Sequence, residues 1–411
     1  MIAIDRYIRP LLVKDSIWFL VFYALVTLLF IVSTISNYGM TILWVKVMVG
    51  LATLIATLSF SWRQTKYRPA NNATLLFLAG AIFFVTSVFW SQNQLFGVMK
   101  AIHFATFFVP VYLIINNAEL LLQARELRVW SQVLIVAGFL IALWVLVSNP
   151  ISFEHNLFQV SIPFIGRLIT YSIVILIAAH FYKYNMKISA IMIIVLIGAL
   201  FFVSFRAGIL VVAISTCFQI AYYMSRSQTK SAVALFFIVL IGFIVGGFSS
   251  PNIAYRSSWM SEVAAGAQVQ DISVSIRIEG AQLAIEKWLA SPLWGVGIGG
   301  YLHPDSVGSV QSILKYPHNL GLELLSEGGL VTFLLFVLSV IAVMYDVIKR
   351  SGRKILRNEY IIGILQLTIC ALVLSMFSKD VTHNLVVFAF FLLVRYTMTE
   401  ERLIKNTSQA Q

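Results

Sequence analysis

Charged residues are scarce in this chain. Asp, Glu, Lys and Arg make up 11% of its 411 residues, whereas soluble globular proteins carry roughly a quarter. Hydrophobic residues make up 60%, and the mean hydropathy is +0.89. Apolar runs of about 17–23 residues recur along nearly the whole sequence, and each is long enough to cross the ~30 Å hydrocarbon core of a bilayer. The sequence therefore excludes a soluble fold and predicts an all-α polytopic membrane protein.

Cysteine is also rare. Cys217 and Cys370 are the only two, and both fall inside predicted membrane helices, which excludes a disulfide framework and a zinc site. The net charge of +12 is concentrated in the loops on one side of the predicted membrane, as in many membrane proteins. It therefore does not indicate a nucleic-acid partner, and we expect contacts with membrane lipids instead.

Twelve apolar runs are candidates for membrane helices, and they are centred near Ala24, Leu51, Ile82, Phe108, Phe139, Val174, Val195, Ala213, Val239, Val337, Ile369 and Ala389. Most connections between them are short and polar. The exception is segment 249–317, between the ninth and tenth predicted helices, which is longer and far less apolar. We therefore expect residues 1–411 to form a single membrane domain of about 12 transmembrane helices, with 249–317 as a long loop insert that contains short helices.

Basic residues predict the orientation. Most of the 29 Lys and Arg residues fall in the N-terminal segment, in alternate loops and in the C-terminal tail, which is typical of cytoplasmic segments. Both termini are therefore expected in the cytoplasm, and the loop 249–317 on the outer face. Arg6, Arg9 and Lys14 precede the first apolar run, which has no small-residue cleavage site and is expected to be an uncleaved anchor.

Arginines on the outer side are few, so each one needs an explanation. Arg206 lies in Ser204-Phe205-Arg206-Ala207-Gly208, a turn of a few residues that would hold its guanidinium group at the outer boundary. Arg167 begins the sixth predicted helix. The alternatives to a functional role are a snorkelling arginine that binds lipid headgroups for Arg206, and an interfacial anchor for Arg167.

Arg277 lies in a predicted amphipathic helix, in which the apolar positions recur at helical spacing: Ile278, Ala281, Ile285, Trp288 and Leu289. This helix is expected to lie against the membrane or the bundle, with Ser275 as its N-cap. Arg277 would then fall in the first turn, where a cation opposes the helix dipole. An anion bound by the free backbone N–H groups would explain that placement. The alternative is an ordinary surface arginine.

A glycine run, Gly295 to Gly300, follows this helix. It matches the pattern G-x-G-x-x-G, but a dinucleotide site also needs a preceding strand and a βαβ unit. An external loop between membrane helices supplies neither. We therefore interpret the glycines as permitting a tight backbone path.

His318 carries the strongest catalytic signal. Pro317 favours the start of a helix, so His318 is expected in the first turn. A helix N-terminus and nearby arginines would lower the pKa of the imidazole, and a neutral His318 could then take a proton from an attacking hydroxyl. Asn319, Glu323 and Glu327 share one helix face, which is a costly group at a membrane boundary unless it is used. The alternative is a histidine that only bonds its own helix.

Lys100 lies near the outer end of the fourth predicted helix. Snorkelling toward the surface would explain a lysine at this depth. The alternative is that it adds positive charge to an anion site.

The segment from Arg277 to Gly329 resembles the O-antigen ligase/polymerase superfamily, and most of all the O-antigen ligases. The residues that carry the likeness are Arg277, Trp288, Pro292, the run Gly295 to Gly300, His318-Asn319, Glu327 and Gly329. Arg206 in its short turn resembles an arginine that the superfamily places between two earlier helices. Twelve helices with one long outer loop late in the chain fit as well.

The resemblance implies a GT-C-like, metal-independent, inverting glycosyltransferase of the bacterial inner membrane, with a periplasmic active site. The donor would be a glycan on undecaprenyl pyrophosphate, and the acceptor a sugar hydroxyl of lipid A–core or of another lipid-linked glycan. No cofactor is expected. The outer loop has no Asp-x-Asp pair for a divalent cation, so guanidinium groups would bind the pyrophosphate instead.

The resemblance also implies roles for particular residues. His318, Arg277 and Arg206 are expected to be catalytic, and a further set is expected to bind substrate: Arg167, Asn319, Glu327 and Lys100. A ligase is favoured because both motif blocks lie in one late outer loop.

Other interpretations remain open at this point. A polymerase that joins lipid-linked repeat units would use the same arginines and histidine, and related members glycosylate proteins. A lipid or glycan transporter (a flippase) is the alternative of another class. Against transport, the ionisable residues gather toward the outer face instead of lining a path across the membrane.

Overall fold

The computed structural model describes residues 47–55, 72–116, 124–148, 162–180, 186–249, 272–302, 316–351 and 359–377. The elements in this part of the chain are all helical: α4 (Asn72–Thr86), η2 (Ser87–Trp90), α5 (Gln94–Asn116), α7 (Ala124–Ser148), α8 (Ile162–Ile175), η4 (Leu176–His180), α9 (Met186–Phe202), α10 (Arg206–Ser225), α11 (Thr229–Ser249), α14 (Ile272–Ala290), α15 (Leu320–Ser351) and α16 (Glu359–Ser375). Residues 47–55 are helical too. The predicted all-α class is confirmed for these residues.

The predicted membrane helices are confirmed in part. Ten of the predicted centres fall inside described helices, whereas Ala24 and Ala389 lie outside the described residues. Within the described part, three helices are long and apolar enough to cross a membrane: Arg206–Ser225, Thr229–Phe248 and Leu320–Tyr345. The total of about 12 and the layout of the loops stay predictions. Much of the insert 249–317 also lies outside the described residues.

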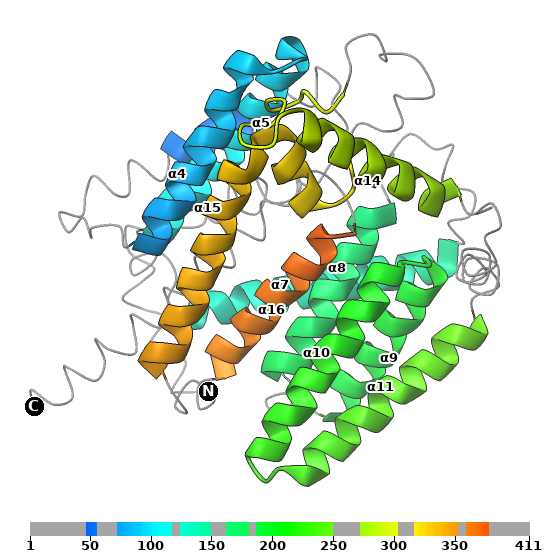
Figure 1. The fold of residues 1–411 in the computed structure, drawn as a ribbon. Helices are drawn as coiled ribbons and strands as arrows, with labels where there is room; N and C mark the ends of the chain where they lie inside the picture. Colours follow the sequence, from blue (N-terminus) through cyan, green and yellow to red (C-terminus); the bar gives the residue numbers. More distant parts are fainter. Residues whose placement is uncertain are drawn as a thin grey trace, which may run out of the picture.

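The helices pack in two groups (Figure 1). α4 packs along α15 on one side, and α8, α9, α10 and α11 pack together on the other, with α16 against α8 and α10. Small residues allow the close contacts. A Cβ atom at Gly246 of α11 would lie 2.7 Å from the Phe201 ring of α9, so these two helices meet at a position that only glycine fits.

In Figure 1, α14 crosses above the ends of α8 and α16, and it packs against α15. The predicted helix is therefore confirmed, but its buried side is formed by the small residues Gly280 and Ala284. Ile278, Ile285 and Leu289 lie together on the exposed side, so the predicted apolar face is present but is not the side that packs on the bundle. The small residues decide the orientation because they let α14 lie close to the bundle, where the Tyr301 hydroxyl donates to the carbonyl of Gly280 (3.0 Å).

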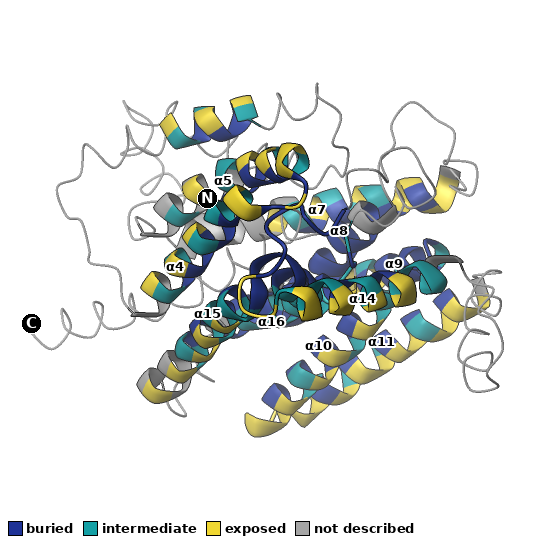
Figure 2. Cartoon of the chain, turned by 45° about the horizontal axis from the view of Figure 1, so that its top comes forward, coloured by how far each residue is buried: buried dark blue, intermediate teal, exposed yellow. Residues whose placement is uncertain are grey.

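Buried residues gather where the loop 295–302 meets the start of α15 (Figure 2). This region brings together the ends of α5, α14, α15 and α16, and several of the residues singled out in the sequence lie there. The candidate site is therefore set into a packed part of the fold.

Candidate functional site

α15 is broken near its start. Gly329 has φ 67 and ψ −174, so the helix is divided into a first part, residues 320–328, and a long second part. The backbone groups released by the break bond to the loop that follows α14. Val296 and Gly297 donate to the carbonyls of Ser326 and Glu327 (both 2.9 Å), and Leu330 donates to the carbonyl of Pro292 (2.9 Å). The glycine pair Gly328-Gly329 is the sequence signal for this break.

The glycine run follows the tight path that the sequence predicts. Gly295, Gly297 and Gly299 all have positive φ. A Cβ atom at Gly295 would lie 2.4 Å from the carbonyl oxygen of Glu327, and one at Gly297 would lie 2.4 Å from the Cα of Ser91. The loop is thus wedged between the α4–α5 connection and the break in α15.

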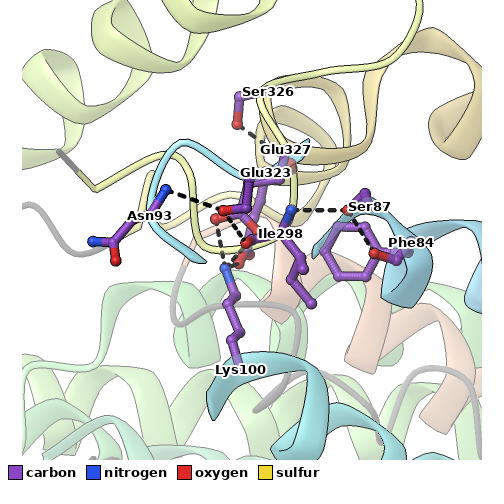
Figure 3. A network of polar contacts seen from close by, with 9 residues as sticks. Phe84, Ser87, Asn93, Lys100, Ile298, Glu323, Ser326 and Glu327 are labelled. Atoms are coloured by element: carbon purple, nitrogen blue, oxygen red, sulfur yellow. Dashed lines mark hydrogen bonds and ion pairs between the residues drawn. The ribbon is translucent and has the colours of Figure 1, made fainter. Parts of the chain in front are cut away.

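Two serines hold this loop from the other side, and Figure 3 shows one of them, Ser87. The backbone N–H of Ile298 donates to Ser87 Oγ (2.8 Å), and Ser91 Oγ donates to the carbonyl of Ile298 (2.8 Å). Ile298 is fully buried. The loop therefore connects η2 and α5 rigidly to the first part of α15.

Lys100 is ion-paired with two glutamates. Its Nζ atom donates to Glu323 Oε1 (2.5 Å) and to Glu327 Oε1 and Oε2 (2.8 and 2.7 Å), and Figure 3 shows it directed from α5 at both carboxylates. The three side chains are at most 1% exposed, so the snorkelling interpretation of Lys100 is wrong. Because both carboxylates are bound to Lys100 within the protein, a direct contact of Lys100 or Glu327 with substrate stays a prediction that these contacts do not support.

His318 precedes the helix and is not in its first turn. α15 begins at Leu320, and Asn319 caps it, because its Oδ1 accepts a hydrogen bond from the backbone N–H of Leu322 (3.0 Å). His318 has φ 56, so the chain turns sharply just before the cap. Its ring packs on that of Tyr316, with 4.5 Å between the ring centroids.

The pKa of His318 is lowered, as the sequence predicts, although the main cause differs. Burial and, to a smaller extent, the positive charge of Arg277 together lower it from 6.5 to about 4. A helix N-terminus and arginines were the expected causes, and burial proves larger. The imidazole is therefore neutral at pH 7, and a neutral imidazole can accept a proton.

Arg277 lies in the second turn of α14, which begins at Ile272. The predicted first-turn placement is wrong, and so is the predicted N-cap Ser275, whose hydroxyl donates to Glu279 within the helix (2.8 Å). The helix begins earlier because Ile272 and its neighbours continue the helical pattern. An anion bound by free N–H groups at the helix start therefore does not explain the position of Arg277. Its side chain instead points to the end of α16, where Nε donates to the carbonyl of Phe377 (3.3 Å).

Three of the predicted site residues converge on this end of α16. Besides Arg277, Asn319 Nδ2 donates to the carbonyl of Met376 (3.1 Å), and Arg167 Nη2 donates to the carbonyl of Leu374 (3.4 Å). Carbonyls at a helix C-terminus lack intrahelical partners and carry partial negative charge, so they attract donors and cations. Arg167 is 6% exposed, which contradicts the interfacial anchor that we considered for it.

Arg206 lies at the start of α10, after a turn in which Ser204 has φ 54. The predicted short turn is confirmed. Phe205 fixes it against α8, since a Cβ atom at Gly166 would lie 2.4 Å from the Phe205 ring. The turn therefore lies beside Gly166, which precedes Arg167 in the chain. The hydrogen bonds described above to the end of α16 come from Arg167, Arg277 and Asn319.

Tyr316 was not singled out in the sequence, and it links the parts of this site. Burial and Glu323 raise the pKa of its phenol to about 12, while Arg167, Lys100 and Arg277 act in the opposite direction. Tyr316 is therefore surrounded by the charged groups and touches His318. Only its position two residues before His318 could have drawn attention to it.

These helices and this site define a helical membrane protein with cations and a neutral histidine gathered where several helices end. The cationic side chains suit a diphosphate, and the histidine suits a hydroxyl that must lose its proton.

Residues 190–337 match the model of the O-antigen ligase family, and the resemblance seen in the sequence is thereby confirmed. The matched segment is similar to O-antigen ligase/polymerase-type proteins, a family of glycosyltransferase-like enzymes of lipopolysaccharide biosynthesis with lipid-linked glycan substrates. It includes Arg206, Arg277, His318 and Glu327 but neither Lys100 nor Arg167. No curated protein matches this chain.

Proposed function

We propose that this protein is an O-antigen ligase of the bacterial inner membrane, with both termini in the cytoplasm. It transfers O-antigen polysaccharide from undecaprenyl pyrophosphate to lipid A–core on the periplasmic face, without a metal ion and with inversion at the anomeric carbon. The observation that carries the proposal is a neutral His318 beside Arg277, at the junction of α14, α15 and α16.

The proposed reaction is a single displacement. The acceptor hydroxyl donates a hydrogen bond to the neutral imidazole of His318 and attacks the anomeric carbon. A C–O bond to the acceptor forms, and the bond between the anomeric carbon and the diphosphate oxygen breaks with its electron pair on that oxygen. Because burial and Arg277 keep the pKa of His318 near 4, the imidazole does not retain the proton at pH 7 and passes it to the released diphosphate or to water.

Arg277 and Arg206 would stabilise the charge that develops on the leaving diphosphate. A guanidinium group binds phosphate through two parallel hydrogen bonds, and such groups take the place of a divalent cation in the proposed site. Arg167 and Asn319 then support substrate binding, whereas the carboxylate of Glu327 is bound to Lys100. Arg167 and Asn319 do so from the end of α16, where they hold the carbonyls of Leu374 and Met376.

The proposed function is tested by analysing lipopolysaccharide from a strain that lacks this gene. We expect core without O-chain, together with long chains that accumulate on the polyprenyl carrier. Core that bears a single repeat unit would instead identify a polymerase. Unchanged lipopolysaccharide in the deletion strain would contradict both activities.

A further inference from the structure

The first part of α15 is too short to hold its own position. Residues 320–328 form a helix of nine residues before the break at Gly329, and isolated helices shorter than about 12–15 residues are only marginally stable in water. This segment carries Asn319 and His318 at its beginning. The placement of His318 therefore depends on what holds the segment from outside.

Backbone contacts fix the far end of the segment. The loop after α14 bonds to the carbonyls of Ser326 and Glu327, which lie just before the break. These bonds set the end distant from His318. At the near end the Asn319 side chain donates to the carbonyl of Met376, and between the two ends the segment is held by side-chain contacts.

Lys100 provides such a contact. Glu323 and Glu327 lie one helical turn apart on one face of the segment, and both bond to the ammonium group of Lys100 in α5. Fully buried ion pairs contribute little net stability compared with apolar packing, but they can fix one register over its alternatives. A cation that binds two carboxylates four residues apart defines both the rotation of the segment about its axis and its position along that axis relative to α5.

We propose, on the basis of the proposed function, that Lys100 is a positioning residue for His318. Its ion pairs with Glu323 and Glu327 hold residues 320–328 in one register against α5, and this register places His318 beside Arg277. The link to His318 runs through Tyr316, whose ring packs on the imidazole and which lies within electrostatic reach of Lys100, Glu323 and Arg277. Lys100 does not touch the substrate.

Kinetics of three variants test this role. Lys100→Met removes the cation, whereas the triple variant Lys100→Met/Glu323→Gln/Glu327→Gln removes every charge of the cluster and so avoids buried carboxylates without a partner. The exchange variant Lys100→Glu/Glu323→Lys reverses one ion pair and keeps both the net charge and the link between α5 and α15.

We expect Lys100→Met and the neutral triple variant to lower kcat by about 100-fold, since displacement of a reacting group by about 1 Å has an effect of this size. The KM for the lipid-linked donor should change by less than about threefold. The exchange variant should recover kcat to within about tenfold of the wild type. A raised donor KM with unchanged kcat in Lys100→Met would show that Lys100 binds the donor, and wild-type kcat in the neutral triple variant would also overturn the proposal.

Chemical modification gives a readout that does not need glycosyl transfer. Diethyl pyrocarbonate reacts with neutral imidazole, and mass spectrometry of the peptide that contains His318 follows its rate against pH. In the neutral triple variant, we expect the midpoint to rise by about one pH unit or more toward the ordinary value for histidine, because the imidazole leaves its buried place beside Arg277. The exchange variant should restore the wild-type midpoint.

The transfer kinetics and the chemical modification together distinguish the positioning role of Lys100 from the proposed function. An unchanged modification profile in the neutral triple variant would overturn the positioning role, whatever the enzyme transfers. A shifted profile in a protein that transfers no glycan would support the positioning role and contradict the proposed function.

Discussion

At the scale of single residues, His318 combines a strained backbone with a buried side chain. His318 has a backbone with φ 56, which costs on the order of 1 kcal/mol for a residue other than glycine. It is also held between the Tyr316 ring and the charge of Arg277. The surrounding contacts must outweigh that cost, and they keep the imidazole neutral in the range where it has to accept a proton.

The pH dependence of the reaction follows from this environment. Because the pKa of His318 is lowered to about 4, the imidazole is neutral at pH 5–8 and one of its nitrogens can accept a proton. Protonation of the imidazole removes this base only as the pH falls through about 4. We therefore expect the contribution of His318 to kcat/KM to be constant between pH 8 and about 5 and to fall below that. Transfer assays over this range, in which His318→Ala provides the background, measure it. A half-maximal loss near pH 6.5 that disappears in His318→Ala would contradict the buried placement.

Lysine substitutions at Arg206 and Arg277 distinguish the effect of positive charge from the effect of side-chain geometry. Lysine keeps the positive charge but loses the planar fork that binds phosphate through two hydrogen bonds. We expect Arg206→Lys and Arg277→Lys each to lose at least about 90% of transfer activity, which corresponds to about 1.4 kcal/mol or more, while the protein is still inserted in the membrane. Arg226→Lys is the matched control, because Arg226 lies at the other end of α10, over the Tyr222 ring. Full activity of both site variants would instead support the interpretation that these arginines snorkel and bind lipid headgroups.

At the scale of elements, the break in α15 and the glycine run form one unit. Gly329 has φ 67, and a Cβ atom there would lie 2.2 Å from the carbonyl oxygen of Leu293. The loop and the helix can therefore meet only if this position is glycine, and the same contact sets the end of the segment that carries His318.

Gly329→Ala should consequently be severely destabilising. A backbone with φ 67 and ψ −174 is essentially restricted to glycine and costs an alanine roughly 1–3 kcal/mol, and the clash with Leu293 adds to this. We expect a lower melting temperature of the detergent-solubilised protein and loss of transfer. Gly198→Ala in α9 is the control, because no atom lies within 4 Å of the Cβ that it would add. Equal melting temperatures of the two variants would contradict the observed contact.

The helices and the tight turns could be predicted from the sequence, because they depend on local patterns. The apolar runs, the turn before Arg206 and the compact glycine loop are all signalled by neighbouring residues. The partners of Lys100 could not be predicted, since Glu323 and Glu327 lie more than 220 residues away in the chain. The same holds for the α16 carbonyls that Arg167, Arg277 and Asn319 share.

The start of α14 illustrates the limit of local signals. Ser275 is a good capping residue, but the helix continues for three residues before it, to Ile272. A capping propensity of this kind is a weak preference, which the helical pattern of the preceding residues overrides here, and the predicted first-turn position of Arg277 was wrong for that reason.

At the scale of the whole molecule, the distribution of basic residues predicts the orientation. A reporter enzyme fused after Ser309 should be active only on the periplasmic side, and one fused after Arg353 only in the cytoplasm, since basic loops are retained inside. Both fusion points lie outside the described residues. The opposite pattern would place His318 in the cytoplasm and contradict a periplasmic reaction.

The central claim is that His318 removes a proton from the acceptor while arginines hold the diphosphate. The most direct test uses purified protein, undecaprenyl-pyrophosphate glycan and lipid A–core in a buffer that contains EDTA. We expect the wild type to form glycosylated lipid A–core, and His318→Ala to turn over about 10²–10⁴-fold more slowly while it binds the donor with nearly unchanged affinity. Wild-type turnover by His318→Ala, or wild-type activity that is lost in EDTA and restored by magnesium or manganese, would contradict it.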